Sequence, residues 1–369
     1  MEQSSGSFNS NAISKIKKNP LGVISFLLIV SAALISVFSY AISNDKVKDA
    51  NQQNVIIAHK PMGYKQLLID VPLDNYTGKT SLSDFLFGKQ VETEQIAIDS
   101  YRINDESVFY IPYLGEGLDS EEQSLPLSVW TSKGIAKQEI EQKFIYQKKF
   151  IFGTDAYGRD FFSRLVIGTR ISFLIGFIAV FISLLVGIPI GAIGGYYRGR
   201  TDDIIMWLIN VVWSIPTLLL VIAITLAIGK GFWQIFVAVG LTMWVEVARI
   251  VRGQFISYRE NEFVEAARAM GFSNRRIIFK EILPNILAPV IVISAANFAA
   301  AILVESGLSF LGIGAQPPTP SWGNLIKENY SHIIIGQAHL ALFPGIAIML
   351  LVLAFNVFGN VLRDAFDVK

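Results

Sequence analysis

Residue types that do covalent chemistry are scarce in this sequence of 369 residues, and they do not gather into a site. The chain has no cysteine, which excludes thiol catalysis, thiolate metal sites and disulfide bonds. Its histidines, His59, His332 and His339, are too scattered for a metal site. A Gly-Lys-Thr run begins at Gly78, but a phosphate-binding loop needs a glycine where Leu73 stands. We therefore expect no catalytic residue, no metal site and no cofactor bound by this chain.

Charged residues of opposite sign recur at helical spacing over positions 155–170, where the pattern predicts a helix. Side chains three or four residues apart share one helix face and can form ion pairs. We interpret this stretch as a solvated helix at the membrane surface rather than as a ligand site. Its charged residues are Asp155, Arg159, Asp160, Arg164 and Arg170.

A polar, basic segment, EAARAMGFSNRRIIFKEILPN at 265–285, lies between two apolar runs. Residues 265–270 and 275–281 are predicted to form short helices, because most of them are good helix formers. Gly271 lies between them, where a tight turn needs a residue with a free choice of φ. Pro284 lacks an amide donor and predicts a bend into the following apolar helix. The segment is thus expected to fold as helix, turn and helix.

The composition of the chain indicates a membrane protein. Hydrophobic residues make up 52%, charged residues 17%, and the mean hydropathy is +0.47. A net charge of +1 argues against a nucleic-acid partner. Apolar runs approach the roughly 20 residues that a helix needs to cross a bilayer at 21–43, 171–197, 204–229, 231–250, 286–304 and 341–362. We interpret the first as an uncleaved transmembrane helix, because it exceeds the roughly 7–15 apolar residues of a signal peptide.

Lysine and arginine concentrate before the first run, after the second, between the fourth and fifth, and after the sixth. Short loops rich in these residues stay in the cytoplasm. We therefore predict that both termini are cytoplasmic, with an N-terminal segment at 1–20 and a cytoplasmic loop at 251–285.

Residues 44–150 then fall outside the cytoplasm. They mix strand-like runs, QLLIDVPL and SVFYIPYL, with turn residues, and we predict a small folded, β-containing extracytoplasmic insertion. A disordered loop is the alternative, but aromatic and β-branched residues occur here at ordinary density.

The pattern E-A-A, three residues, Gly, nine residues, and then Glu281 before a closing ILP resembles the cytoplasmic coupling loop of bacterial ABC importer permeases. Three further stretches resemble the C-type subunit of the dipeptide, oligopeptide and nickel permeases. They are GTDAYGRDFFS at 153–163, GLSFLGIGAQPPTPSWGNLI at 307–326 and ALFPGIAIMLLVLAFNVFGNVLRDAFD at 341–367. The chain is identified on these stretches as a member of that family, with a permease core at 151–369. The resemblance implies an all-α membrane protein with six transmembrane helices.

The resemblance also implies partners and a role. A second permease subunit would complete the pore in the bacterial cytoplasmic (inner) membrane, two ATPase subunits would hold ATP and Mg, and an extracytoplasmic substrate-binding protein would deliver dipeptides or oligopeptides. This chain would have no ATPase site of its own. The residues that would couple it to the ATPase subunits are Glu265, Ala266, Ala267, Gly271, Ile282, Leu283 and Pro284.

Two acids lie at or near membrane depth. Glu246 precedes Arg249 by one helical turn, and we predict an intramembrane ion pair. Glu305 closes the fifth apolar run and could line the path of a peptide's amino group, although a structural role is equally open. Pro317 and Pro318 restrict φ and favour a rigid loop at the outer mouth. Glu305, Pro317 and Pro318 are therefore candidates for the translocation path or gate.

Two other classes of function were weighed. An ion-coupled secondary transporter should show internal repeats and acids near the middle of the membrane, whereas the sequence shows no repeat and its acids fall near the ends of the predicted spans. A membrane-anchored receptor or scaffold would act through 44–150, but the specific stretches lie in the rest of the chain.

Overall fold

The computed structural model describes residues 14–79, 81–229 and 231–366. Residues 1–13 of the predicted N-terminal segment lie outside this description. The chain divides into two compact units. We call residues 1–33, 172–316 and 346–369 the helical unit, and residues 34–171 and 317–345 the sheet unit. Each is described by itself below.

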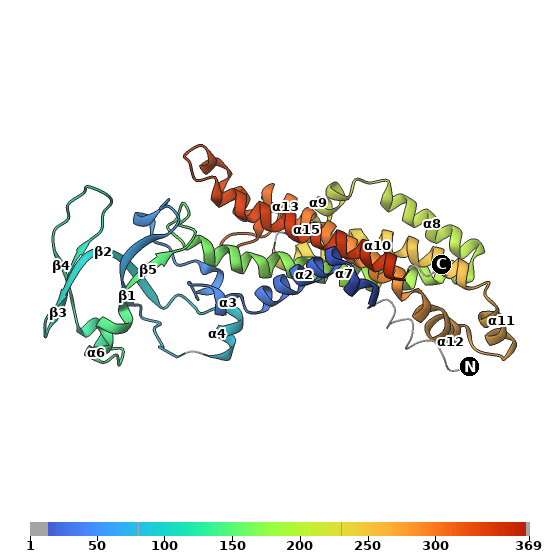
Figure 1. The fold of residues 1–369 in the computed structure, drawn as a ribbon, viewed down its shortest axis with the longest axis horizontal. Coiled ribbons are helices and arrows are strands. Elements are labelled where there is room, and N and C mark those ends of the chain that lie inside the picture. Colours follow the sequence, from blue (N-terminus) through green and yellow to red (C-terminus); the bar gives the residue numbers. More distant parts are fainter. Residues whose placement is uncertain (1–13, 80, 230, 367–369) are drawn as a thin grey trace. The chain divides into compact units, whose positions relative to one another are not determined.

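Five helices in the described residues are long and apolar enough to cross a membrane (Figure 1). They are α2 (Pro20–Val37), α7 (Phe161–Tyr197), α10 (Phe232–Tyr258), α13 (Leu287–Phe310) and α15 (His339–Phe366). α8 (Gly199–Trp213) and α9 (Thr217–Ile228) together make a sixth candidate span, but they are bent by 90° relative to each other. The all-α membrane fold is thus confirmed, with six spans if the bent pair counts as one.

The bend divides the apolar run at 204–229 into two helices. Pro216 caps the start of α9 with an extended ψ of 125° and cannot donate an amide to the end of α8. α10 also differs from its predicted run, because it continues past residue 250 to Tyr258. Arg252, in this added part, is held by Asp202 of α8 through two bonds of 2.5 Å. A polar turn of helix therefore forms where hydropathy alone predicts an end.

Close packing of α7 against α10 rests on a stripe of small residues. Gly187, Gly191 and Gly195 recur every four positions on one face of α7. A Cβ atom at Gly191 would lie 2.4 Å from the carbonyl oxygen of Ala248, and one at Gly187 would lie 2.7 Å from that of Trp244. Glycines at this spacing let two helix backbones touch inside a membrane. The spacing of these glycines is visible in the sequence.

The sheet unit contains a five-stranded antiparallel sheet with the order β4-β3-β2-β1-β5 (Figure 1). Its strands are β1 (Tyr64–Pro72), β2 (Thr93–Ile103), β3 (Ser107–Pro112), β4 (Gln123–Pro126) and β5 (Ile145–Phe150). The first four follow one another, and β5 returns to pair with β1. This confirms a β-containing insertion between the first two long helices.

Both faces of the sheet are covered, because successive side chains of each strand point to opposite sides. Ile69 and Ile98 pack on one side with Trp130 of the short helix α5 (Ser128–Thr131). The Trp130 indole N–H donates to the Asp70 carbonyl oxygen over 3.0 Å. Leu68 packs on the other side in a second cluster. Two buried faces identify a folded domain rather than a disordered loop.

Replacing Gly191 by valine should disrupt the contact between α7 and α10. The added atoms would meet the backbone of α10 at Ala248 and Arg252 and the Cβ of Val251, none of which can move aside easily, so we expect a loss of stability of about 1–3 kcal/mol or more. The control is Gly253→Val in α10, where a Cβ would meet nothing within 4 Å. Thermal unfolding of both purified variants in detergent measures the difference, and equal midpoints would contradict the packing described here.

Candidate functional site

The polar segment between α10 and α13, residues 259–286, is named the coupling segment below. It contains α11 (Glu262–Ala269), α12 (Asn274–Arg276), a π-helical turn, η4 (Ile277–Ile282), and a 3-10 turn, η5 (Leu283–Ile286). The helix-turn-helix expected from the sequence is present. At Pro284, however, the helix is not interrupted: it passes from a π-helical turn through a 3-10 turn into α13, and residues 274–310 form one helical run.

Gly271 ends α11 in the way its position suggested. Its φ is +76°, in the left-handed region. Its N–H donates to the Arg268 carbonyl oxygen over 2.9 Å, and the Phe272 N–H donates to that of Ala267 over 3.1 Å. This pair of bonds is a Schellman cap, and it satisfies carbonyl groups that the helix end would leave free.

The inner face of the coupling segment is anchored on the helices of its own unit. Tyr196, near the end of α7, donates its hydroxyl hydrogen to Asn274 Oδ1 over 2.8 Å, and the Arg268 guanidinium lies 5.5 Å from its ring centre. A single apolar cluster joins the segment to α7, α10 and α13, and its members include Val264, Ala267, Ile277, Ile278, Ile282, Ile286, Val251, Phe255 and Val290. Because so much of its inner face is buried, the segment is built to move together with these helices.

The outer face exposes large apolar side chains among charges. Phe263, Met270 and Phe279 are 39%, 64% and 62% exposed. Exposed apolar side chains rimmed by charges are typical of protein contact sites. The sequence analysis did not single out these three residues, although an apolar residue beside charges in a polar segment could have indicated them.

The structure divides the seven predicted coupling residues between the two faces. Ala267 and Ile282 are buried in the apolar cluster, and Leu283 is partly buried against it. The others are on the surface: Glu265, Ala266, Gly271 and Pro284.

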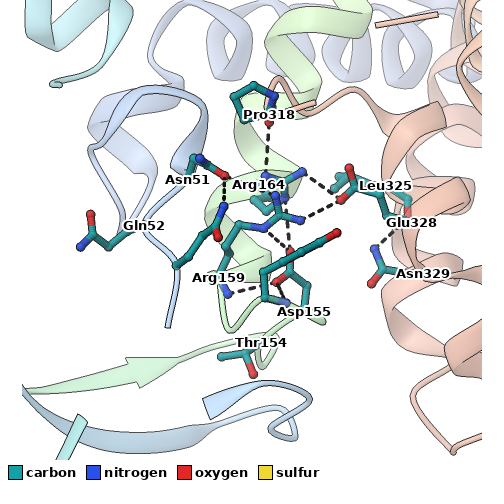
Figure 2. A network of polar contacts seen from close by, with 12 residues as sticks. Asn51, Gln52, Thr154, Asp155, Arg159, Arg164, Pro318, Leu325, Glu328 and Asn329 are labelled. Atoms are coloured by element: carbon teal, nitrogen blue, oxygen red, sulfur yellow. Dashed lines mark hydrogen bonds and ion pairs between the residues drawn. The ribbon is translucent and has the colours of Figure 1, made fainter. Parts of the chain in front are cut away.

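A second constellation, in the sheet unit, is a buried network of two arginines and two acids (Figure 2). Arg159 Nε donates to Asp155 Oδ2 over 2.6 Å, and its Nη2 donates to Glu328 Oε2 over 2.8 Å. Arg164 Nη2 donates to the same Glu328 oxygen over 3.2 Å, and its Nε lies 3.6 Å from Asp155 Oδ2. The Arg164 side chain has no exposed surface. The two positive and two negative charges balance, as burial demands.

The network joins segments that are far apart in the sequence. Glu328 belongs to α14 (Trp322–Asn329), Arg164 also donates to the carbonyl oxygen of Pro318 over 3.4 Å, and Arg159 donates to Asn51 Oδ1 over 3.3 Å. Ion pairs and hydrogen bonds together thus tie the start of α7 to the 317–329 segment, and the bond to Asn51 ties it to the beginning of the insertion.

The predicted helix over 155–170 is wrong in its first part, since α7 begins only at Phe161. Asp155 accepts backbone N–H bonds from Tyr157 and Arg159, which hold a turn there instead. Asp160 accepts from the Ser163 hydroxyl rather than pairing with an arginine. Arg170 lies over the rings of Tyr40 and Phe87. Glu328, which completes the network, was missed because nothing in the sequence links it to position 159.

The sheet unit also has an open groove of about 980 Å³ beside β1, β2 and β5. Burial raises the pKa of Asp70 to about 6, although the Tyr146 hydroxyl donates to this carboxylate over 3.1 Å. Gln95 donates in turn to the Tyr146 oxygen over 2.8 Å. The groove is polar and carries charges of both signs, among them Asp45, Glu92, Lys133 and Lys148. In the part of the chain that the structure describes, no three histidine or acidic side chains converge as metal ligands would.

The candidate gate residues lie in different surroundings. Glu305 is fully buried in the helical unit, where its Oε1 accepts from the Ser309 hydroxyl over 2.7 Å. The Ser309 oxygen accepts from the Ala315 N–H over 3.2 Å, so this cluster folds the 311–315 loop onto the end of α13. Pro317 and Pro318 are exposed and are joined by a cis peptide bond.

The ion pair predicted between Glu246 and Arg249 is wrong. Arg249 instead lies over the ring of Trp213 of α8, with the guanidinium carbon 4.2 Å from the ring centre. A planar guanidinium stacks well on an indole face, and this contact directs Arg249 away from Glu246.

Apolar helices of this number and length define a multi-pass membrane protein. Residues 187–369 match the family described as "binding-protein-dependent transport system inner membrane component". The chain is 41% identical over 217 residues to the glutathione transport system permease protein GsiD of Pectobacterium atrosepticum, an alignment that covers 59% of this chain and 72% of the relative. It is 44% identical over 218 residues to the dipeptide transport system permease protein DppC of Alkalihalophilus pseudofirmus, covering 59% and 71%.

Among solved structures, an inward-facing form of the MetNI methionine ABC transporter is similar, with 19% identity, a TM-score of 0.46, and coverage of 55% of this chain and 95% of that chain. The sequence similarities decide the assignment. The chain belongs to the family of inner-membrane components of binding-protein-dependent transport systems, and it is a permease subunit. The family resemblance seen in the sequence is thereby confirmed.

Replacing Glu328 by glutamine should destabilise the sheet unit, because two arginines would then share one carboxylate in a buried place. We expect a loss of about 3 kcal/mol. The control is Glu122→Gln, which removes an exposed ion pair with Arg102 and should cost no more than about 1 kcal/mol. Chemical unfolding of the full chain in detergent compares the two. Similar losses for both variants would show that the network does not stabilise the unit.

Proposed function

We propose that this chain forms half of the pore of an ATP-driven importer of dipeptides or oligopeptides. The coupling segment carries this proposal: its inner face is fixed to α7, α10 and α13, while its outer face leaves Phe263, Met270 and Phe279 exposed. Short-peptide cargo is supported by the relatives that serve dipeptide and glutathione transport.

In the proposed mechanism, the exposed face docks into a groove of an ATPase subunit. Two such subunits bind ATP and Mg, and this chain contributes no ATPase site. When ATP draws the ATPase subunits together, the docked segment moves with them, and its buried face passes the movement to the helices as a rigid body. A second permease subunit of similar fold completes the pore.

The proposed orientation places the coupling segment and both termini in the cytoplasm. The insertion, with its open polar groove, then lies outside, where a substrate-binding protein arrives. Glu305, Pro317 and Pro318 are proposed as part of the outer gate. The bonds through Ser309 support this, because they hold the loop after α13 in a defined position.

Fusions to a reporter enzyme that is active only outside the cytoplasm test this orientation. Fusions near residues 100 and 320 should be active, and fusions near 200 and 270 should be inactive, because basic loops stay inside. Reporter activity at 270 would reject the proposed topology and the docking of the coupling segment with it.

Two variants of the coupling segment test transmission. Gly271→Val places a β-branched residue at a φ of +76°, which is strained, and Met270→Asp puts a charge on the exposed apolar face. Both chains should insert and assemble, yet cargo-stimulated ATP hydrolysis and peptide uptake by the reconstituted complex should fall at least about tenfold. Met62→Asp, at a similarly exposed methionine of the insertion, is the matched control. Transport at the unmodified rate in both coupling variants would reject the proposed role.

A further inference from the structure

Glu246 lies near the middle of the candidate span Trp233–Tyr258, not near its end as the shorter predicted helix implied. It is exposed, as are Leu241 and Arg249 on the same helix. A charged side chain inside the apolar part of a bilayer is costly if it faces lipid. This side of α10 must therefore face water or protein.

The surroundings of Glu246 form a small cavity of about 170 Å³ within the helical unit. Its walls come from the end of α8, the start of α9, the middle of α10, and α13. Thr217 and Thr242 bring hydroxyl groups, and the other residues around the carboxylate are apolar. The cavity thus lies at the 90° break between α8 and α9. Breaks of this kind at membrane depth are tolerated where they border protein or a wet path.

Within the described residues, Glu246 has no hydrogen bond and no ion pair. The chain does supply a cation one turn away, but Arg249 stacks on Trp213 instead. Because the Glu246 carboxylate has no permanent partner, although an arginine lies one turn away, it is free to bind a cationic group of a ligand for a short time. The cavity has roughly the volume of five or six water molecules, so it admits an amine and its neighbouring carbons rather than a whole peptide.

We propose that the Glu246 carboxylate binds the positively charged amino group of the cargo during its passage. This inference rests on the proposed import of peptides. It places recognition of the amino group at the break between α8 and α9 rather than at Glu305.

The experiment uses the complete transporter, with its binding protein, in proteoliposomes. The maximal rate of ATP-dependent uptake is measured for two tripeptides whose side chains carry no charge. One has a free amino terminus, and the other is its N-acetylated analogue. Glu246→Gln should lower uptake of the free-amine peptide about tenfold, as expected for loss of one charge-assisted hydrogen bond, and should change uptake of the acetylated peptide less than about twofold. Glu246→Asp should keep the preference. The control for loss of a negative charge is Asp364→Asn, because Asp364 is an exposed acid of α15 that does not line the cavity beside Glu246.

The outcomes separate the two proposals. If the unmodified transporter imports neither peptide, peptide import fails, and this inference fails with it. If it imports the free-amine peptide and Glu246→Gln leaves that rate unchanged, or slows both peptides equally, only the role of Glu246 is rejected. If Glu246→Gln releases the second permease subunit on purification, the carboxylate pairs with that subunit and the inference is also rejected. If the unmodified transporter imports only the free-amine peptide, the role of Glu246 is supported when Glu246→Gln lowers the uptake rate of that peptide about tenfold and Glu246→Asp does not.

Discussion

The contact between the backbones of α7 and α10 is the constraint on which the helical unit depends. The three glycines bring the helices together, and the surface that results is the one that Val264, Ala267 and Ile277 cover. Without that close approach, the coupling segment would lose the surface of α7 and α10 against which its inner face packs. The hydrophobic contacts of the segment therefore depend on this backbone contact, because Val251 and Phe255, which face Gly191 and Gly195, belong to the same apolar cluster.

Polar groups at the ends of the long helices are handled by specific pairing. Asp202 holds Arg252 where α10 extends beyond its apolar run, and Glu260 holds Arg198 at the start of α8 over 2.7 Å. In the sheet unit, Arg159 and Arg164 share Glu328 and Asp155. Breaking the buried pairs of Arg159 and Arg164 would leave a charge in a place from which water is excluded, so these pairs specify a geometry more strongly than they add stability. Glu246 has no such partner among the described residues, although it lies within a candidate span.

Local patterns in the sequence predicted what local physics decides. Gly271 was expected at a turn, because such a turn needs a residue that can adopt a left-handed φ. The strand-like runs of the insertion predicted a sheet, because they are rich in β-branched and aromatic residues. The break at Pro216, the partner of Arg249 and the acid that completes the network at Arg159 were not predicted in this form. The contacts of Arg249 and Arg159 depend on residues from other segments, Trp213 and Glu328, and spacing along the chain carries no information about such contacts. The break at Pro216 is local, since it follows from the amide that proline lacks. The seven residues of the coupling pattern were found together, but only packing could show that Ile282 points inward while Pro284 does not.

The π-helical turn at Ile277–Ile282 has a consequence for the register of the helix that follows. A π turn holds one residue more than an α turn, and one residue corresponds to about 100° of rotation in an α-helix. The extra residue therefore sets the rotational phase of α13 separately from that of α12, within a single helical run of 37 residues. The face that the coupling segment presents to a partner and the face that α13 presents to its neighbours can thus be chosen independently. Deleting one residue from this turn would leave all the other side chains of the run unchanged. It would nevertheless rotate one of the two faces by about 100° away from its partner.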